Sequence, residues 1–316
     1  MRRVALIYNP ASGQYSARRA GHLQGVLAEL RKAGIDADAL ETSAPGSAGA
    51  LAKLALRNRY DTVIACGGDG TVHEVLQHLV GTDVALGVVP LGTANALAQN
   101  LGLGGSPVKA IRQLISATPT QIPVGRIFYR DNAGTEQSRY FTVAAGIGAD
   151  ALLMSRLDAE LKRRLGYALY IVEAFQVWVM SPFPLFKAEF ITEGMAERRM
   201  EEVSQLLAVR VRSFGGVLRK LAPGATLRNG TLTLVAFKTR SRFLYLRFLL
   251  AVIAGRHTFK SKVELLEAVA VDCRARSGSR ATVYVEADGE VLGTLPARLE
   301  VATEKLILLI PPNAEP

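Results

Sequence analysis

The feature that most limits how this chain can fold is a short apolar run that leads directly into a glycine-rich loop. Residues 62–66 have the length and the β-branched content of a buried strand. Glycine fills three of the next four positions, so the backbone there can bring bare amides close to a ligand. A helix that begins near Thr71 would point its free N–H groups at the same place, which suits an anion. We therefore predict a phosphate-binding turn with the sequence Gly67-Gly68-Asp69-Gly70-Thr71-Val72-His73-Glu74.

Asp69 lies among these expected phosphate donors. The simplest interpretation is that its carboxylate holds the Mg²⁺ that accompanies a nucleotide. The alternative is a tight strand-to-helix turn in which Asp69 is the N-cap of the helix and binds nothing else. This loop alone does not separate the two interpretations.

Two further strand-to-loop junctions favour the phosphate-binding interpretation. Apolar residues 4–8 run into Asn9-Pro10-Ala11-Ser12-Gly13. Apolar residues 84–89 run into Pro90-Leu91-Gly92-Thr93-Ala94-Asn95, and a helix-like stretch follows at 96–101. In an open parallel α/β sheet, loops at the carboxyl ends of adjacent strands lie side by side, and a ligand binds in the crevice that they form. We therefore expect the three loops to build one nucleotide site.

The order and spacing of these motifs resembles the diacylglycerol kinase catalytic family. The chain looks most like the soluble bacterial lipid kinases, a group related to sphingosine and ceramide kinases. The resemblance continues through residues 141–151 (FTVAAGIGADA) and ends in Ala287-Asp288-Gly289-Glu290, so it spans nearly the whole chain. The Gly-Gly-Asp-Gly-Thr piece is shared with NAD kinases and phosphofructokinases. The Pro-Leu-Gly-Thr-x-Asn piece is much more selective for lipid kinases, which disfavours the rival prediction of an NAD kinase.

The resemblance implies an ATP-dependent kinase that phosphorylates a hydroxyl of a lipid. Diacylglycerol is the leading acceptor, and its product would be phosphatidic acid, a step in phospholipid biosynthesis. Phosphatidylglycerol, a sphingoid base and ceramide stay open as acceptors, because acceptor choice lies in the second domain, where no motif can be decoded. Asp69 would hold the Mg²⁺ bound to the nucleotide. The expected nucleotide site comprises Asn9, Pro10, Ala11, Ser12, Gly13, Thr42, Gly67, Gly68, Asp69, Gly70, Thr71, Val72, His73, Glu74, Thr93 and Asn95.

Phosphoryl transfer to a hydroxyl also needs a base near the attacking oxygen. In relatives the Asp-Gly-Glu motif supplies the proton acceptor, so the resemblance gives this role to Asp288 or Glu290 without choosing between them. Together with Asp69 they are the expected catalytic residues. The alternative interpretation is a β-hairpin turn, which favours Asp-Gly for conformational reasons alone.

The chain divides into two patterns. In residues 1–122 short apolar strands alternate with helical stretches such as 17–33 and 46–58, which predicts a parallel sheet covered by helices. In residues 123–297 many strands with turn signals predict an antiparallel β-sandwich, with one helical interruption at 149–180. By resemblance, residues 298–316 return to the α/β domain, and the active site lies in the cleft between the domains. The expected sandwich strands are 141–145, 187–191, 206–212, 231–237, 262–273 and 281–286.

The charge balance favours anionic partners. Lys plus Arg exceeds Asp plus Glu by 38 to 28, which suits a nucleotide, a nucleic acid or an acidic lipid. Nothing supports sequence-specific nucleic-acid binding, since the arginines are scattered and no known module is present. The two cysteines, Cys66 and Cys273, do not suggest a disulfide framework, so a reducing cytoplasm fits.

No membrane span can be drawn from the sequence. The apolar windows 165–180 and 243–255 contain Glu173 and Arg247, and the second is shorter than the roughly 20 residues that a bilayer requires. We therefore expect a cytoplasmic protein that meets its lipid by peripheral association with the membrane. The aromatic and basic residues of 243–250, and the aromatic residues of 178–186, suit this association, although a core helix and a buried turn are the alternatives. The oligomeric state is undetermined, and a homodimer stays open.

Three positions depart from the family pattern. Relatives usually carry Asp-Gly in a turn that holds a structural Mg²⁺, with ligands three residues before that Asp and two after. Here the turn is Asn229-Gly230, so the ligand positions become Thr226, Asn229 and Thr231, whose neutral oxygens bind Mg²⁺ less well than a carboxylate. Pro123 stands where many relatives have an Asp of the metal-linked network. Gln14 stands where several have a basic residue, for which Arg18 or Arg19 would substitute.

These departures leave open a catalytically impaired sensor of lipid or nucleotide. Retention of Asp69, Asp288 and Glu290 argues against that alternative. A zinc site at His73 and His78 is excluded, because five residues place two side chains about 140° apart around a helix, whereas zinc proteases of that type space their histidines four apart.

Overall fold

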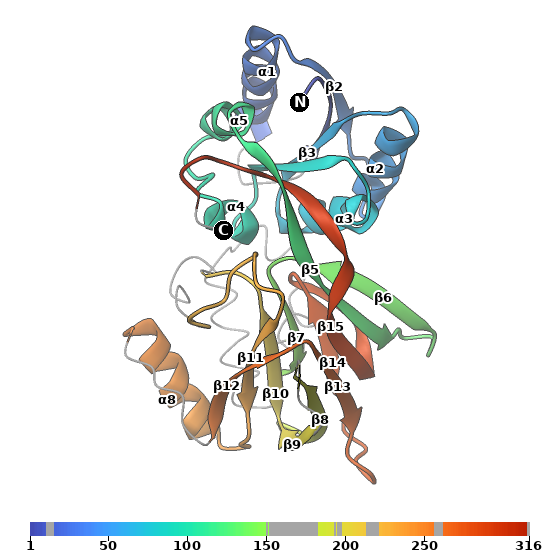
Figure 1. Cartoon of the computed structure of the whole chain (residues 1–316), viewed down its shortest axis with the longest axis vertical. Helices are drawn as coiled ribbons and strands as arrows, with labels where there is room; N and C mark the ends of the chain where they lie inside the picture. Colours follow the sequence, from blue (N-terminus) through green and yellow to red (C-terminus); the bar gives the residue numbers. More distant parts are fainter. Residues whose placement is uncertain are drawn as a thin grey trace. The chain divides into compact units, whose positions relative to one another are not determined.

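The computed structural model describes residues 1–10, 16–149, 151, 183–192, 194, 198–212, 221–255 and 262–314 (Figure 1). The chain forms two compact units, Met1–Val124 with Thr303–Pro316, and Gly125–Ala302. Residues 11–13 of the expected nucleotide site, Gln14, and the expected helical stretch from residue 152 onward lie outside the described residues.

The first unit contains a parallel sheet. Its strands lie in the order β2 (Asp36–Glu41), β1 (Arg3–Tyr8), β3 (Thr62–Gly67) and β4 (Ala85–Pro90), and every neighbouring pair is parallel. Leu308 near the end of β15 (Glu290–Ile310) pairs in parallel with Leu86 of β4. All six residues of β3 are buried, as an apolar run flanked by parallel strands requires. The predicted α/β domain is confirmed.

Helices alternate with these strands, as the sequence predicts. α2 packs against α3, and α1 packs against α5. α5 shows how the local sequence sets a helix: the Ser106 hydroxyl accepts a hydrogen bond from the Lys109 amide, Pro107 occupies the first turn, and Ala110, Ile111 and Leu114 are buried. The helices of this unit are α1 (Ser16–Lys32), α2 (Ser47–Arg57), α3 (Asp69–Leu79), α4 (Ala96–Asn100) and α5 (Pro107–Ile115).

The second unit is an antiparallel β-structure. One run of strands has the order β12-β11-β10-β7-β14-β15, and a second runs from β15 through β13 and β8 to β9. Every pair in these two runs is antiparallel. β5 pairs with β15 and with β6. The strands are β5 (Thr118–Arg130), β6 (Glu136–Phe141), β7 (Ala144–Gly148), β8 (Phe186–Ile191), β9 (Arg199–Val203), β10 (Gln205–Val209), β11 (Leu232–Phe237), β12 (Val263–Ala268), β13 (Ala270–Ala275) and β14 (Tyr284–Ala287).

Alternation along the strands fills the core of this unit. Phe186, Ala188 and Phe190 of β8 belong to the apolar cluster, while Lys187 between them is exposed. This two-residue period is the pattern of a sheet with one buried face. The cluster takes such residues from both runs of strands, among them Leu206 on β10 and Val271 on β13. The predicted β-sandwich is confirmed.

Candidate active site

The glycine-rich loop joins β3 to α3, and its geometry requires glycine. α3 begins at Asp69, two residues before the predicted start at Thr71. A Cβ at Gly67 would lie 2.4 Å from the Thr71 hydroxyl oxygen, so a side chain there would displace the first turn of the helix. Gly68 has the N-cap position and makes no side-chain cap. The loop is thus a tight strand-to-helix turn that leaves backbone amides at the helix N-terminus for an anion.

Asp69 does not cap its own helix. Its two carboxylate oxygens accept hydrogen bonds from the backbone amides of Asn95 (2.8 Å) and Ala96 (2.7 Å), at the start of α4. The alternative interpretation, in which Asp69 is the N-cap of α3, is therefore wrong. Gly68 has the N-cap position, and the two amides that donate to the Asp69 carboxylate lie at the start of α4. A carboxylate is also the kind of ligand that Mg²⁺ prefers in proteins.

The loops after β3 and β4 are in direct contact. A Cβ at Gly92 would lie 2.6 Å from the Gly68 Cα, and the Leu91 amide donates to the Gly67 carbonyl (2.9 Å). Asn95 adopts a left-handed backbone (φ 46°), and its side-chain amide forms hydrogen bonds with both the N–H (2.9 Å) and the C=O (2.6 Å) of Gly92. Two of the three expected loops therefore form one compact structure, in which Asn95 holds its own loop closed.

The ends of β1 and β2 continue this row of strand termini. The Asn9 amide donates to the Cys66 carbonyl (3.1 Å), and its side-chain amide donates to the Thr71 hydroxyl (3.3 Å). Thr42, directly after β2, is buried, and its amide donates to the Tyr8 carbonyl (2.9 Å). Asn9 thus links the first loop to the glycine-rich loop. Pro10 is described, whereas Ala11, Ser12 and Gly13 lie outside the described residues.

Other members of the predicted nucleotide site have packing or capping contacts. The Glu74 carboxylate accepts from the amides of Gly46 (2.7 Å) and Ala48 (3.0 Å) and so caps the N-terminus of α2. Val72 and His73 are buried on α3. Thr93 is exposed in the loop before α4. Of these four residues, only Thr93 lies open to a ligand in the described part of the chain.

The Asp-Gly-Glu motif forms the hairpin turn between β14 and β15. Asp288 and Gly289 both have positive φ (48° and 85°), and Ala287 pairs with Glu290 across the turn. The Asp288 carboxylate accepts from the amides of Thr142 (3.0 Å), Val143 (2.9 Å) and Ala144 (3.1 Å). The motif therefore adopts the hairpin turn that the alternative interpretation predicts. The hydrogen bonds of Asp288 connect this turn to residues 142–144 at the start of β7.

Glu290 differs from Asp288 in its surroundings. Its side chain is exposed, and no hydrogen-bond donor among the described residues contacts its carboxylate. Sequence reasoning missed Glu286, which is buried and accepts a hydrogen bond from the Gly289 amide (2.9 Å). Its signal was an acidic residue at a buried position of an otherwise apolar strand, two residues before Asp288. The carboxylates of Asp288 and Glu286 thus stabilise the turn through hydrogen bonds, and the Glu290 carboxylate is open to solvent.

The predicted metal ligands of the Asn229-Gly230 turn point to separate protein partners. The Thr226 hydroxyl accepts from the Arg228 amide (3.0 Å), and the Asn229 side chain donates to the Gly224 carbonyl (3.1 Å). The Thr231 hydroxyl donates to the Glu267 carboxylate (3.4 Å). In the part of the chain that the structure describes, no group of three or more His, Cys, Asp or Glu side chains is placed to hold a metal ion. These three side chains do not fit a metal centre.

Family models account for almost all of the chain. The diacylglycerol kinase catalytic domain matches residues 3–127, and the YegS C-terminal NAD kinase beta sandwich-like domain matches residues 142–310. The chain belongs to the diacylglycerol kinase catalytic family. It is accordingly an enzyme of the lipid kinase class. The loops after β1, β3 and β4 fall within the first match, and the Asp288 turn falls within the second.

Relatives of this family match along nearly their full length. A diacylglycerol kinase of Bacillus subtilis (strain 168) is 29% identical, over 94% of this chain and 92% of that protein. A diacylglycerol kinase of Mycobacterium tuberculosis (strain ATCC 25618 / H37Rv) is also 29% identical, over 98% of this chain and 95% of the relative. The similarity to these relatives therefore extends over nearly the whole chain.

Solved structures share the fold. The crystal structure of a diacylglycerol kinase from Bacillus anthracis str. Sterne has a TM-score of 0.70 at 18% identity and covers 99% of this chain and 98% of its own. Yeast NADH kinase complexed with NADH has a TM-score of 0.53 at 11% identity, covering 99% of this chain and 84% of its own. At these identities the likenesses show the fold alone.

Proposed function

We propose that this chain is an ATP-dependent lipid kinase that transfers the γ-phosphoryl group to a hydroxyl of diacylglycerol, giving phosphatidic acid. The observation that carries the proposal is the pair of hydrogen bonds from the Asn95 and Ala96 amides to the Asp69 carboxylate. These bonds connect the Pro90–Asn95 loop to the glycine-rich loop. The Pro90–Asn95 loop has the sequence that is selective for lipid kinases. The names of the relatives in Bacillus subtilis and Mycobacterium tuberculosis support diacylglycerol as the acceptor.

The nucleotide would bind at the ends of the parallel strands. In this proposal the donors to the phosphate oxygens are backbone amides at the start of α3 and the exposed Thr93. Asp69 fits the role of a Mg²⁺ ligand, since a carboxylate is the ligand that Mg²⁺ prefers and this one lies in the first turn of α3, where the phosphates would bind. Mg²⁺, when bound, neutralises charge that develops on the transferring phosphoryl group.

Glu290 is our choice for the base, and Asp288 is a positioning residue. Three backbone amides donate to the Asp288 carboxylate, whereas Glu290, two residues later in the chain, is exposed. In the proposed step the acceptor hydroxyl oxygen bonds to the γ-phosphorus while the bond to the oxygen bridging the β-phosphate breaks. ADP leaves, and the hydroxyl proton passes to Glu290.

Diacylglycerol resides in membranes, so the enzyme would work in the cytoplasm and at the membrane surface. Among the described residues, no helix is both long and apolar enough to cross a bilayer. Peripheral association is therefore the route that we propose to the acceptor.

The test is a kinase assay with a defined set of acceptors. Purified protein would be given radiolabelled ATP, Mg²⁺ and one of diacylglycerol, phosphatidylglycerol, sphingosine, ceramide or NAD, and the products separated by chromatography. We expect label in phosphatidic acid, and its loss in Asp69→Asn and Glu290→Gln. Label in NADP and none in lipid would favour a nicotinamide nucleotide kinase, and label in no product would overturn the proposal.

A further inference from the structure

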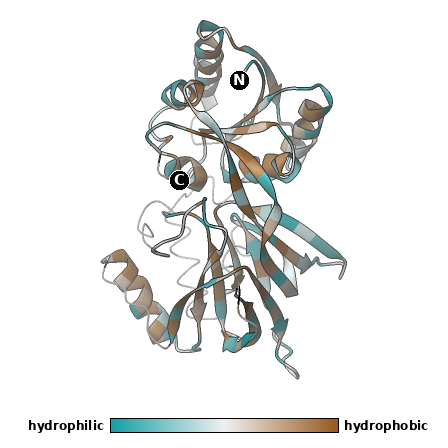
Figure 2. Ribbon diagram, in the orientation of Figure 1, coloured by the Kyte–Doolittle hydropathy of each residue, from teal (hydrophilic) through white to brown (hydrophobic). Residues whose placement is uncertain are grey.

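Exposed apolar side chains gather on one helix of the second unit, α8 (Arg242–Ile253). Seven large hydrophobic side chains are exposed among the described residues, and four of them lie on this helix, the largest being Phe243 at 68% exposed. The other three lie singly on α2, β9 and β15. Figure 2 shows α8 coloured as hydrophobic along most of its length. A contiguous exposed apolar surface marks a contact site more often than scattered single residues do. Its four members are Phe243, Leu249, Leu250 and Ile253.

The opposite side of α8 is fixed to the sandwich. Phe248 and Val252 are buried, and the rings of Tyr245 and Phe248 pack on Phe237 at the end of β11, with centroids 4.5 and 5.2 Å away. The Ser204 and Tyr245 hydroxyls are 2.7 Å apart. At about 100° per residue, the four exposed side chains fall within an arc of about 120° that faces away from Phe248 and Val252. The anchoring contacts therefore present the apolar arc to solvent.

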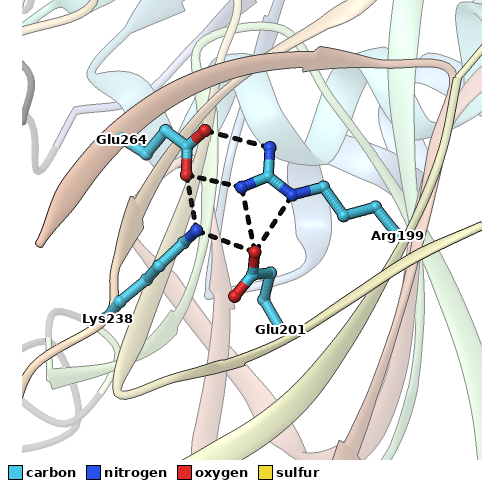
Figure 3. A network of polar contacts seen from close by, with 4 residues as sticks. All are labelled: Arg199, Glu201, Lys238 and Glu264. Atoms are coloured by element: carbon cyan, nitrogen blue, oxygen red, sulfur yellow. Dashed lines mark hydrogen bonds and ion pairs between the residues drawn. The ribbon is translucent and has the colours of Figure 1, made fainter. Parts of the chain in front are cut away.

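The charge beside this arc is uniformly positive. The sequence from residue 239 to 262 contains Arg240, Arg242 and Arg247 and has no Asp or Glu. Arg240 and Arg247 are exposed, and no carboxylate of the described chain pairs with either of them. A neighbouring cation behaves differently, because the Lys238 ammonium contacts the carboxylates of Glu201 (2.9 Å) and Glu264 (2.5 Å) (Figure 3). Arg240 and Arg247 thus remain available to external anions.

We propose that α8 is the element by which this protein docks on a membrane surface that carries anionic lipid. Apolar side chains that enter the acyl boundary, with arginines at the level of the headgroups, are the pattern of an interfacial helix. The proposal rests on the proposed function, since a lipid acceptor has to be reached at a bilayer. A second copy of the chain would be less suited to this surface, because it would bring the same uncompensated arginines.

Vesicle sedimentation tests this docking. The probes are vesicles of phosphatidylcholine alone and of phosphatidylcholine mixed with phosphatidylserine. We expect the native chain to bind the mixed vesicles more tightly, Phe243→Ser with Leu250→Ser to weaken binding at least tenfold, and each of Arg240→Gln and Arg247→Gln to weaken it roughly fivefold. Met200→Ser is the matched control, since Met200 is exposed at 61% on β9 of the same unit and should leave binding unchanged.

Activity on a short-chain diacylglycerol in detergent micelles separates docking from catalysis. The α8 variants should keep this activity, because the micellar substrate does not require a bilayer. Equal vesicle binding by the native chain and the Phe243→Ser, Leu250→Ser variant would overturn the docking proposal. If sedimentation equilibrium shows that the native chain forms dimers and this variant does not, α8 is a dimer interface and the proposal is also overturned. Failure of the native chain to phosphorylate the micellar lipid would overturn the proposed function and would leave the vesicle result to be judged by itself.

An independent observation concerns the turn at which relatives are expected to hold a structural Mg²⁺. Arg210, directly after β10, is 1% exposed, and its guanidinium donates to three backbone carbonyls of that turn. The acceptors are the carbonyl oxygens of Leu227 (3.3 Å), Asn229 (3.0 Å) and Thr231 (3.3 Å). Burial lowers the pKa of Arg210 to about 10, which still leaves it charged at neutral pH. Converging carbonyls around a positive charge are the arrangement that a bound cation also produces.

We infer that the Arg210 guanidinium takes the place of a metal ion in the Asn229-Gly230 turn. The three expected side-chain ligands, Thr226, Asn229 and Thr231, are engaged by other protein groups, and the carbonyls beside them face Arg210 instead. The turn should therefore be stable without Mg²⁺. The cation that orders it is covalently part of the chain.

Thermal unfolding with and without Mg²⁺, in the absence of nucleotide, tests this inference. We expect no Mg²⁺-dependent rise in the Tm of the native chain and a lower Tm for Arg210→Met, which leaves three carbonyls without their donor. Arg210→Lys keeps the charge but not the forked geometry, so its Tm should lie between those of the native chain and Arg210→Met. This variant keeps the test usable if Arg210→Met fails to fold. Arg210→Met combined with Asn229→Asp should gain a Mg²⁺-dependent rise. A clear Mg²⁺ response of the native chain, or an unchanged Tm in both Arg210 variants, would overturn the inference.

Discussion

The carboxylate of Asp69 receives the backbone amide of Asn95 at 2.8 Å, across two loops that are separated by a whole helix and strand in the sequence. The same carboxylate receives the Ala96 amide at 2.7 Å. The acidic residue expected to hold Mg²⁺ is therefore also the residue that fixes the start of α4. Because both roles use the same carboxylate, substitutions at Asp69 should affect both stability and catalysis.

Asp69→Asn removes the charge but keeps one oxygen acceptor, and Asp69→Ala removes both. We expect Asp69→Asn to lower kinase turnover by about 10²-fold or more, the scale of a lost electrostatic contact in a transition state. Asp69→Ala should also lower the free energy of unfolding by about 1–3 kcal/mol, because two amides lose their acceptor. Turnover assays and urea unfolding measure the two effects. Near-native turnover of Asp69→Asn would rule out its proposed role toward Mg²⁺.

The two carboxylates of the β14–β15 turn should respond differently to the loss of charge. Glu290→Gln should lower turnover by roughly 10²-fold while ATP affinity and stability stay near native, since the exposed Glu290 carboxylate holds no part of the described structure. Asp288→Asn replaces one oxygen of a carboxylate that accepts three amides, so a lower free energy of unfolding, by about 1–3 kcal/mol, is expected.

The decisive comparison is the turnover of the two folded variants at saturating ATP. If Glu290→Gln keeps the native turnover and Asp288→Asn loses it, the roles are reversed. If both variants turn over at the native rate, neither residue is the base.

The fold and the three loop positions could be predicted because they depend on local patterns. Buried parallel strands such as Thr62–Gly67 are uninterrupted apolar runs, and sandwich strands such as Phe186–Ile191 alternate with a period of two. The start of α3 was misplaced by two residues, since a glycine pair gives no N-cap signal to mark it.

What the sequence did not reveal are partners that lie far away along the chain. The Glu74 carboxylate caps α2, which precedes it by a strand, and no pattern around Glu74 encodes that contact. Asp69 and Arg210 likewise bind backbone groups of other loops. Almost every residue has a backbone amide and carbonyl, so the residue type at a position does not show whether its backbone binds a distant side chain. Long-range contacts of this kind therefore become visible only with the tertiary structure.

The contact between the two phosphate-side loops depends on Gly92. A Cβ at this position would lie 2.6 Å from the Cα of Gly68 and 2.9 Å from the Asn95 side-chain oxygen, so Gly92→Ala must push the loops apart. We expect a loss of about 1–3 kcal/mol in the free energy of unfolding, typical of overpacking, and a raised KM for ATP. Gly104→Ala is the control, because a Cβ there meets no atom within 4 Å. Equal KM values in the two variants would show that the loop contact does not shape the nucleotide site.

The ion pair between α1 and α5 should give the first unit a stability that depends on pH. The Arg112 guanidinium donates to both oxygens of Glu29 (2.8 and 3.1 Å), and with the Lys32 ammonium it lowers the pKa of that carboxyl from 4.5 to about 2. A carboxyl whose pKa is lowered by folding contributes stability that is fully present above about 4.5 and is lost as the pH falls toward about 2.

Glu29→Gln should therefore have a lower Tm than the native chain near neutral pH, and the two Tm values should converge as the pH falls through this window. The difference should be small and should shrink in high salt, because Arg112 is exposed to solvent. Arg112→Gln should remove most of the same pH dependence, which separates this pair from other carboxylates that titrate over the same range. A Tm difference between the native chain and Glu29→Gln that stays constant down to the acid limit would show that the pair adds nothing to stability.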